Sequence, residues 1–130
     1  METQSKNAIK WIKELLTTSE LQGRHSLGNP DRGYCCLGLG CKVLDIKYDK
    51  YDVSSPEFCS SVGLRNPCGV PIGPYLNSIQ SPSNESLISL NDNQKFSFKN
   101  IGNTLVKTPE YYFVTQVAKD VKKYFETKNK

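Results

Sequence analysis

The 130-residue chain has no long hydrophobic run. An α-helix needs roughly 20 consecutive apolar residues to cross a bilayer, and no segment approaches that length. The first twenty residues carry charges of both signs and no apolar stretch, so a signal peptide is not expected. Hydrophobic residues make up 37% of the chain. The sequence therefore predicts one small cytoplasmic domain over residues 1–130, with no membrane contact.

The chain also has little histidine and lacks cysteines at the close spacing that metal-binding and redox motifs use. The only histidine is His25, and no two cysteines have the C-x-x-C spacing. An odd number of cysteines without a secretory signal does not favour a disulfide framework. A zinc site from Cys41, Cys59, Cys68 and His25 would lack a closely spaced ligand pair. We expect no metal, no cofactor and no catalytic residues, and we expect all the cysteines to pack as small apolar side chains. These cysteines are Cys35, Cys36, Cys41, Cys59 and Cys68.

Arginine is the third scarce residue type, because only Arg24, Arg32 and Arg65 stand among the 17 basic residues. All three fall in the middle of the chain. A guanidinium group binds phosphate or carboxylate through two parallel hydrogen bonds and stacks on aromatic rings, which lysine does poorly. A surface ion pair is the alternative role for each arginine. We interpret the three as candidate contacts for an anionic ligand.

The remaining positive charge is spread along the chain, for a net charge of +4. Its densest group lies near the C-terminus, where lysines complement the dipole of a terminal helix. Nucleic-acid-binding domains usually concentrate their cations in one stripe. We therefore expect no nucleic-acid partner. The lysines of the dense group are Lys119, Lys122, Lys123, Lys128 and Lys130.

Hydrophobic spacing and capping residues predict a small α+β domain that is mostly helical, with a short hairpin and an irregular central region. The first helix has an apolar face that includes Trp11, and an outer face with Lys6, Lys10, Lys13 and Glu14. The expected elements are a helix over 5–18, a hairpin over 22–36, helices over 36–45 and 55–63, a loop-rich stretch over 64–93, and helices over 97–107 and 108–126.

Several short motifs resemble a widespread family of small, mostly uncharacterised phage and prophage proteins. They are Trp11, QGR at 22–24, YCCLG at 34–38, LND at 90–92, and Phe98 followed by Ile101. The resemblance covers most of residues 11–106. The chain departs from the family pattern at Gly102, where alanine is common, and in its C-terminal helix. Membership implies a viral protein in the host bacterial cytoplasm and implies no established activity.

The phage setting favours a role against bacterial immunity. Proteins such as the Thoeris anti-defence type enclose nucleotide-derived signals, including cyclic ADP-ribose isomers and cyclic oligonucleotides. Such a pocket needs guanidinium groups for phosphates, rings for stacking, and amides or carboxylates for hydroxyls and base edges. We assign Arg24, Arg65 and Arg32 to phosphates, Tyr34 or Tyr48 to stacking, and Asn91 or Asp92 to hydroxyls and base edges.

Structural roles are the alternatives for these residues: an Arg24–Asp31 ion pair, a core position for Tyr34, and a turn or helix cap for Asn91 and Asp92. The first functional hypothesis is thus a non-enzymatic protein that sequesters such a signal, as a homo-oligomer that encloses the ligand between subunits.

Two other functional hypotheses remain open. One is a protein-interaction module that blocks a host protein directly through the proline-rich stretch 64–86. The other is hydrolysis or group transfer by Cys35 or Asp92 together with His25, which would require turnover of the ligand.

Overall fold

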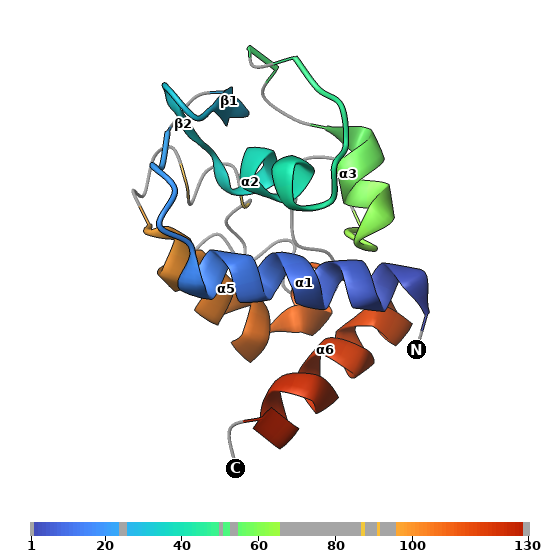
Figure 1. Cartoon of the computed structure of the whole chain (residues 1–130). Coiled ribbons are helices and arrows are strands. Elements are labelled where there is room, and N and C mark those ends of the chain that lie inside the picture. Colours follow the sequence, from blue (N-terminus) through green and yellow to red (C-terminus); the bar gives the residue numbers. More distant parts are fainter. Residues whose placement is uncertain are drawn as a thin grey trace, which may run out of the picture.

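Helix α1 (Thr3–Thr17) lies between the helices from both halves of the chain (Figure 1), and α2, α3, α5 and α6 all pack against it. The computed structural model describes residues 2–23, 26–49, 51–52, 55–65, 87, 91 and 96–128. The other elements are β1 (Gly28–Asn29), β2 (Gly33–Tyr34), α2 (Cys36–Val43), α3 (Pro56–Ser61), α5 (Phe98–Lys107), the 3₁₀ helix η2 (Pro109–Tyr111) and α6 (Thr115–Lys128).

The predicted α+β class with mostly helical content is confirmed by these elements. The expected helices over 5–18, 36–45, 55–63 and 97–107 correspond to α1, α2, α3 and α5, with ends that differ by a few residues. Most of the loop-rich stretch predicted over 64–93 lies outside the described residues. None of the described helices is long and apolar enough to cross a membrane.

Trp11 occupies the middle of the core. Its ring packs edge-on against Phe58, with 4.9 Å between centroids, and against Phe113 at 6.4 Å. Its indole Nε1 donates a 2.9 Å hydrogen bond to the carbonyl oxygen of Cys36. A fully buried indole N–H needs such a partner, since an unpaired one would be costly. This residue therefore joins α1 to α2, to α3 and to the segment before α6.

The cysteines that the structure describes pack inside this core, as predicted. Cys36 and Cys41 are fully buried, and Cys35 and Cys59 are nearly so. Cys35 also caps α2, because its Sγ accepts a hydrogen bond from the backbone N–H of Gly38. Burial raises the pKa of the Cys41 thiol to about 11, which keeps it neutral. Cys68 lies outside the described residues.

The hairpin predicted over 22–36 forms, with strands of only two residues each. Gly28 pairs with Tyr34 and Asn29 with Gly33 in antiparallel register. Gly28 and Gly33 have φ angles of +83° and +85°, which favour glycine. Asn29 closes the turn, because its Oδ1 accepts hydrogen bonds from the backbone N–H groups of Asp31 and Arg32.

Two glycines inside α2 allow neighbouring segments to approach the helix closely. A Cβ atom on Gly38 would lie 1.9 Å from the carbonyl oxygen of Leu27. One on Gly40 would lie 2.2 Å from the ring of Phe58. Both residues weaken an isolated helix by about 1 kcal/mol each. Tight packing against the hairpin and α3 explains why the helix contains them.

The prediction of one continuous helix over 108–126 is wrong. The chain forms η2 first, and α6 begins only at Thr115. Between them, the carbonyl oxygen of Tyr112 accepts from the backbone N–H of Arg65, and the N–H of Val114 donates to the carbonyl oxygen of Gly63. Phe113 also bridges Leu64 in antiparallel fashion. These backbone groups pair with the segment after α3, so they cannot continue a helix.

Replacing Gly38 with alanine should destabilise the protein by about 3 kcal/mol, because the added methyl meets a backbone carbonyl that has little freedom to move. Gly102→Ala is the matched control. There the added methyl meets mainly the end of the Leu16 side chain, at 2.9 Å, and alanine favours the helix. Urea unfolding measures both changes. A Gly38→Ala variant as stable as Gly102→Ala would contradict the close packing of α2 on Leu27.

Candidate functional site

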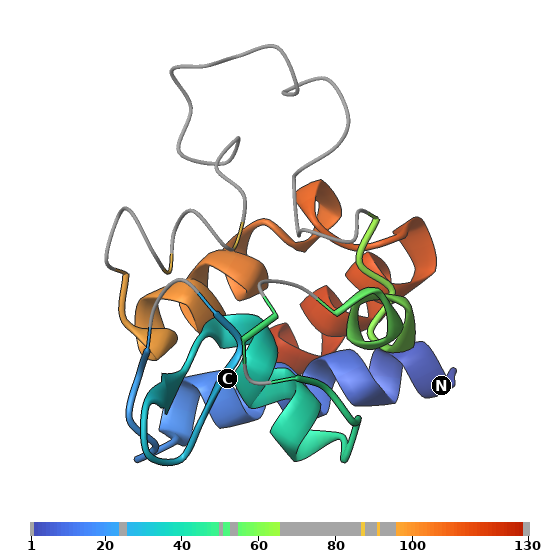
Figure 2. The same ribbon diagram turned by 90° about the horizontal axis from the view of Figure 1, so that it is seen from above.

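The structure does not bring Arg32 and Arg65 together into one site. Arg32 is exposed in the hairpin turn, with its guanidinium 5.1 Å from the ring centre of Tyr51. Arg65 follows α3, is half-buried, and donates from Nε to the carbonyl oxygen of Phe113 at 2.8 Å. Figures 1 and 2 show the hairpin and α3 on opposite sides of α2. Arg24 lies outside the described residues.

Neither tyrosine assigned to stacking presents an open ring. Tyr34 is 3% exposed, and the Nζ of Lys42 lies 5.8 Å from its ring centre. Tyr48 is half-buried, and its hydroxyl donates a 2.9 Å hydrogen bond to the carbonyl oxygen of Gly28. Burial, followed by the nearby Tyr34, raises the pKa of Tyr48 to about 12. Tyr34 is a core residue, and Tyr48 attaches the loop after α2 to the hairpin.

Asn91 is fully buried, and its side-chain amide connects three separate motifs. Its Oδ1 accepts hydrogen bonds from Gln22 Nε2 at 2.8 Å and from the backbone N–H of Cys36 at 3.2 Å. Its Nδ2 donates to the carbonyl oxygen of Gly23 at 2.9 Å. The amide is engaged by protein groups on both sides, so we do not retain the ligand role expected for it. Asp92 lies outside the described residues.

Gln22 extends this network to the start of α5. Its Nε2 also donates to the carbonyl oxygen of Phe96 at 2.7 Å, and its Oε1 accepts from the backbone N–H of Phe98 at 3.1 Å. The segments that carry the QGR, YCCLG and LND motifs thus meet in one hydrogen-bond network around the buried amide of Asn91. That network holds the hairpin, α2 and α5 together.

The described part of the chain does not contain the assembled catalytic group that hydrolysis or group transfer by Cys35 or Asp92 with His25 would require. Cys35 is buried, and its sulfur caps α2. Its proposed partners His25 and Asp92 lie outside the described residues. Among those that the structure describes, no three His, Cys, Asp or Glu side chains are grouped to hold a metal ion. The contact surface expected over 64–86 falls almost wholly outside as well.

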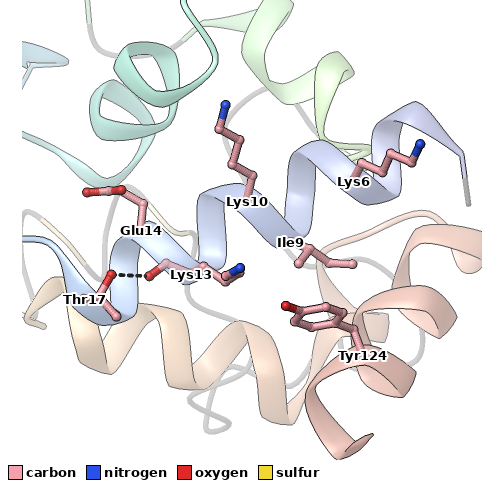
Figure 3. A pocket seen from close by; sticks show the side chains of 7 residues that line it. All are labelled: Lys6, Ile9, Lys10, Lys13, Glu14, Thr17 and Tyr124. Carbon is pink, nitrogen blue, oxygen red and sulfur yellow. Dashed lines mark hydrogen bonds between the residues drawn. The ribbon is translucent and has the colours of Figure 1, made fainter. Parts of the chain in front are cut away.

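A surface groove runs along the outer face of α1 where α6 crosses it (Figure 3). It has a volume of about 440 Å³. Three lysines of α1 supply its positive charge, Ile9 supplies an apolar patch, and Tyr124 of α6 supplies an aromatic ring. The lining residues are Lys6, Ile9, Lys10, Lys13, Glu14, Thr17 and Tyr124.

Helical geometry places the groove lysines on one side of α1. Positions 6, 10 and 13 follow the spacing of four and then three residues that brings side chains onto a common face. All three lysines are exposed, and none of them pairs with a carboxylate in the part of the chain that the structure describes. The Nζ of Lys13 lies 5.9 Å from the ring centre of Tyr124. The groove therefore combines exposed cations with an aromatic ring.

A hydrogen bond between α1 and α6 fixes one end of the groove. Ser5 is fully buried, and its Oγ donates to Asp120 Oδ2 at 2.6 Å. Gln116 Nε2 donates to the other oxygen of the same carboxylate at 3.1 Å. Asp120 precedes Tyr124 by one helical turn, so this bond sets where the Tyr124 ring meets α1.

Sequence reasoning missed the groove for an identifiable reason. The sequence predicts that Lys6, Lys10, Lys13 and Glu14 form the outer face of an amphipathic helix, and it indicates no role for Tyr124. A signal was present, because three cations at helical spacing had few acidic neighbours on that face. Nothing in the sequence indicated that α6 would bring a tyrosine beside them.

Comparison with known proteins assigns no family and no function to this chain. The chain matches no protein-family model, no curated protein and no solved structure. Its resemblance to phage proteins stays a prediction from the motifs.

Replacing Asn91 with alanine should lower the free energy of unfolding by roughly 3 kcal/mol, because the buried N–H of Cys36 and carbonyl of Gly23 lose this partner. Asn7→Ala is the matched control. Asn7 is half-buried and donates one hydrogen bond, to the carbonyl oxygen of Ser61, so its loss should cost about 1 kcal/mol or less. Chemical denaturation measures both, and equal losses would argue against the structural role of Asn91.

The raised pKa of Tyr48 predicts a loss of stability in alkali. The folded state keeps the phenol proton up to about pH 12, whereas an unfolded tyrosine releases it near its ordinary pKa of 10.0. Unfolding therefore releases a proton between these values, and stability falls as the pH rises through that window. Tyr48→Phe should start about 1 kcal/mol less stable at pH 8, because it lacks the hydrogen bond to Gly28.

That variant should then lose less stability than the wild type on going from pH 10 to pH 11.5. Urea unfolding at each pH measures the difference between the two proteins. Tyr34 and Cys41 also have raised pKa values and are present in both, so their contributions cancel. Parallel curves for the two proteins would show that Tyr48 does not titrate as inferred.

Proposed function

We propose that the protein is a non-enzymatic binder of a nucleotide-derived ligand, and that the groove between α1 and α6 is its binding site. The observation that carries this proposal is one groove that combines an aromatic ring with three lysines, none of which forms an ion pair with a described carboxylate. Phosphates provide the negative charge that such lysines attract, and a nucleobase provides the planar face that a tyrosine ring stacks on.

The charge of the groove supports an anionic ligand. Lysine ammonium groups bind phosphate as mobile point charges and do not impose the fixed geometry of a guanidinium fork. Such a site holds phosphates by attraction that salt weakens, because its cations are exposed to solvent. We therefore expect affinity to fall as ionic strength rises.

The aromatic side of the groove supports a ligand with a ring. Tyr124 is half-buried, and its ring packs edge-on against Phe125 at 5.0 Å, which limits its freedom. A base that stacks on Tyr124 must displace the Lys13 ammonium from the ring. An exposed cation–π contact is worth about 0.5–1 kcal/mol, so this cost is small. The released ammonium then becomes available to a phosphate.

The groove's size and chemistry support binding without turnover. A volume of about 440 Å³ lies within the roughly 300–1,000 Å³ of typical small-molecule sites. Among the described residues, no cysteine or histidine lines the groove, and the Thr17 hydroxyl donates its proton to the carbonyl oxygen of Lys13 at 2.8 Å. These groups can hold a ligand but do not form a nucleophile–base pair.

In a phage setting such a protein would sequester an immune signal. One chain supplies the whole groove, so capture does not require the homo-oligomer that the sequence favoured, and that oligomer stays a prediction.

Calorimetric titration with a cyclic ADP-ribose isomer and with a cyclic dinucleotide tests the proposal. The variant Lys10→Glu/Lys13→Glu should weaken binding at least tenfold, because it reverses two of the groove's charges. Its control, Lys99→Glu/Lys107→Glu, makes the same change in net charge at exposed positions of α5 and should bind normally. Tyr124→Leu keeps an apolar side chain but removes the ring, and should also weaken binding.

Two results would overturn the proposal. One is the failure of both ligands to bind at physiological salt. The other is equal binding by the groove variant and its α5 control, which would place the site elsewhere. Recovery of intact ligand after the protein is denatured separates a binder from an enzyme, since a hydrolase would return altered products.

A further inference from the structure

The positive charge of the groove lies toward one end only. Along α1 its lining runs from Lys6 through Lys10 and Lys13 to Glu14 and Thr17. At about 1.5 Å per residue, this face spans roughly 16 Å from Lys6 to Thr17. Figure 3 shows Lys6 at one end, Thr17 at the other, and Tyr124 facing the middle, near Ile9 and Lys13. Cations therefore occupy the part toward the N-terminus of α1, and oxygen atoms occupy the other end.

The two oxygen-bearing residues prefer hydroxyl donors. Among the described residues, Glu14 is the one acidic side chain that lines the groove, and it forms no ion pair with any of them. A carboxylate is an acceptor with room for two hydrogen bonds. Thr17 already donates its proton to the carbonyl oxygen of Lys13, so its Oγ1 has only lone pairs to offer a ligand. Both groups repel a phosphate oxygen and accept from an O–H.

From this polarity we infer that the ligand lies in the groove with its phosphates toward the lysines and an unphosphorylated sugar edge toward Glu14 and Thr17. The preferred class is a nucleoside 5′-phosphate whose 2′- and 3′-hydroxyls are both free. Nucleotides phosphorylated at the 3′ position, including those joined by 3′–5′ phosphodiesters, are disfavoured. Glu14 is the residue that determines this specificity. The inference rests on the proposed function, since it concerns the same groove.

The two hydroxyls of a ribose are spaced to donate to one carboxylate, which makes Glu14 a suitable partner for the free diol. A phosphate at the 3′ position would replace a donor by a negatively charged acceptor at that point. It would then meet the like charge of Glu14 at hydrogen-bond distance. The same carboxylate thus favours one ligand class and excludes the other, which is how specificity arises at a site of modest affinity.

ADP and adenosine 3′,5′-bisphosphate form a matched pair of probes, because each carries two phosphates and they differ in where the second one is attached. The wild-type protein should bind ADP at least tenfold more tightly in calorimetric titrations. Glu14→Gln should reduce that preference to less than threefold, and Glu14→Lys should reverse it. Glu57→Gln removes one charge from an exposed position on α3 and should leave the preference unchanged.

The ratio of the two affinities is the decisive measurement. Removing the charge of Glu14 also takes away a negative charge one helical turn from Lys10, which makes the groove more attractive to any phosphate. That effect raises both affinities together and does not change their ratio. Equal binding of the two nucleotides by the wild type, or a preference for the bisphosphate, would overturn the inference while leaving the proposed function in place. If the protein binds neither ADP, nor the bisphosphate, nor a cyclic ADP-ribose isomer, the proposed function itself is wrong.

Discussion

The fully buried indole of Trp11 is the contact on which the arrangement of the helices depends. Its ring packs against Phe58 and Phe113, and its N–H bonds to the start of α2. A buried aromatic residue of this size contributes several kcal/mol to a core, and the indole hydrogen bond restricts how its partners can be placed around it. Because α1 is held from the inside in this way, its outer face is rigid and exposed, which suits a binding surface.

The motifs that resemble the phage family describe this interior and not the groove. Gln22 and Cys36 both donate hydrogen bonds to the buried side chain of Asn91. Gly38 permits the contact between α2 and the hairpin. Residue types that pack or bond in only one way are restricted by the fold itself. Members of such a family would therefore share these motifs whatever they bind. Function must be sought on the surface that the motifs leave unspecified, as is usual for sites carried by a common fold.

Helical periodicity and capping residues predicted most of the fold, because these signals lie within a few residues of one another. The cap residues Ser55 and Ser97 and the apolar face of α1 are examples. The break before α6 could not be predicted in this way. Residues 112–114 follow a helical pattern locally, and only their backbone pairing with the segment after α3 shows why the helix starts later. A local sequence pattern does not show when backbone pairing with a distant segment outweighs the local preference for a helix.

The candidate site escaped prediction for the related reason that it belongs to two helices at once. The sequence predicted a site built from arginines and from the LND motif. In the structure the Arg32 guanidinium lies over the Tyr51 ring, and Arg65 donates to the backbone carbonyl of Phe113. Asn91 of the LND motif is fully buried. The lysines of α1 look like an ordinary hydrated face until Tyr124 is placed against them. The part-buried Ser5–Asp120 hydrogen bond, one turn before Tyr124 on α6, helps to place it there. A small polar contact between the ends of the chain thus converts a charged helix face into a groove with an aromatic wall.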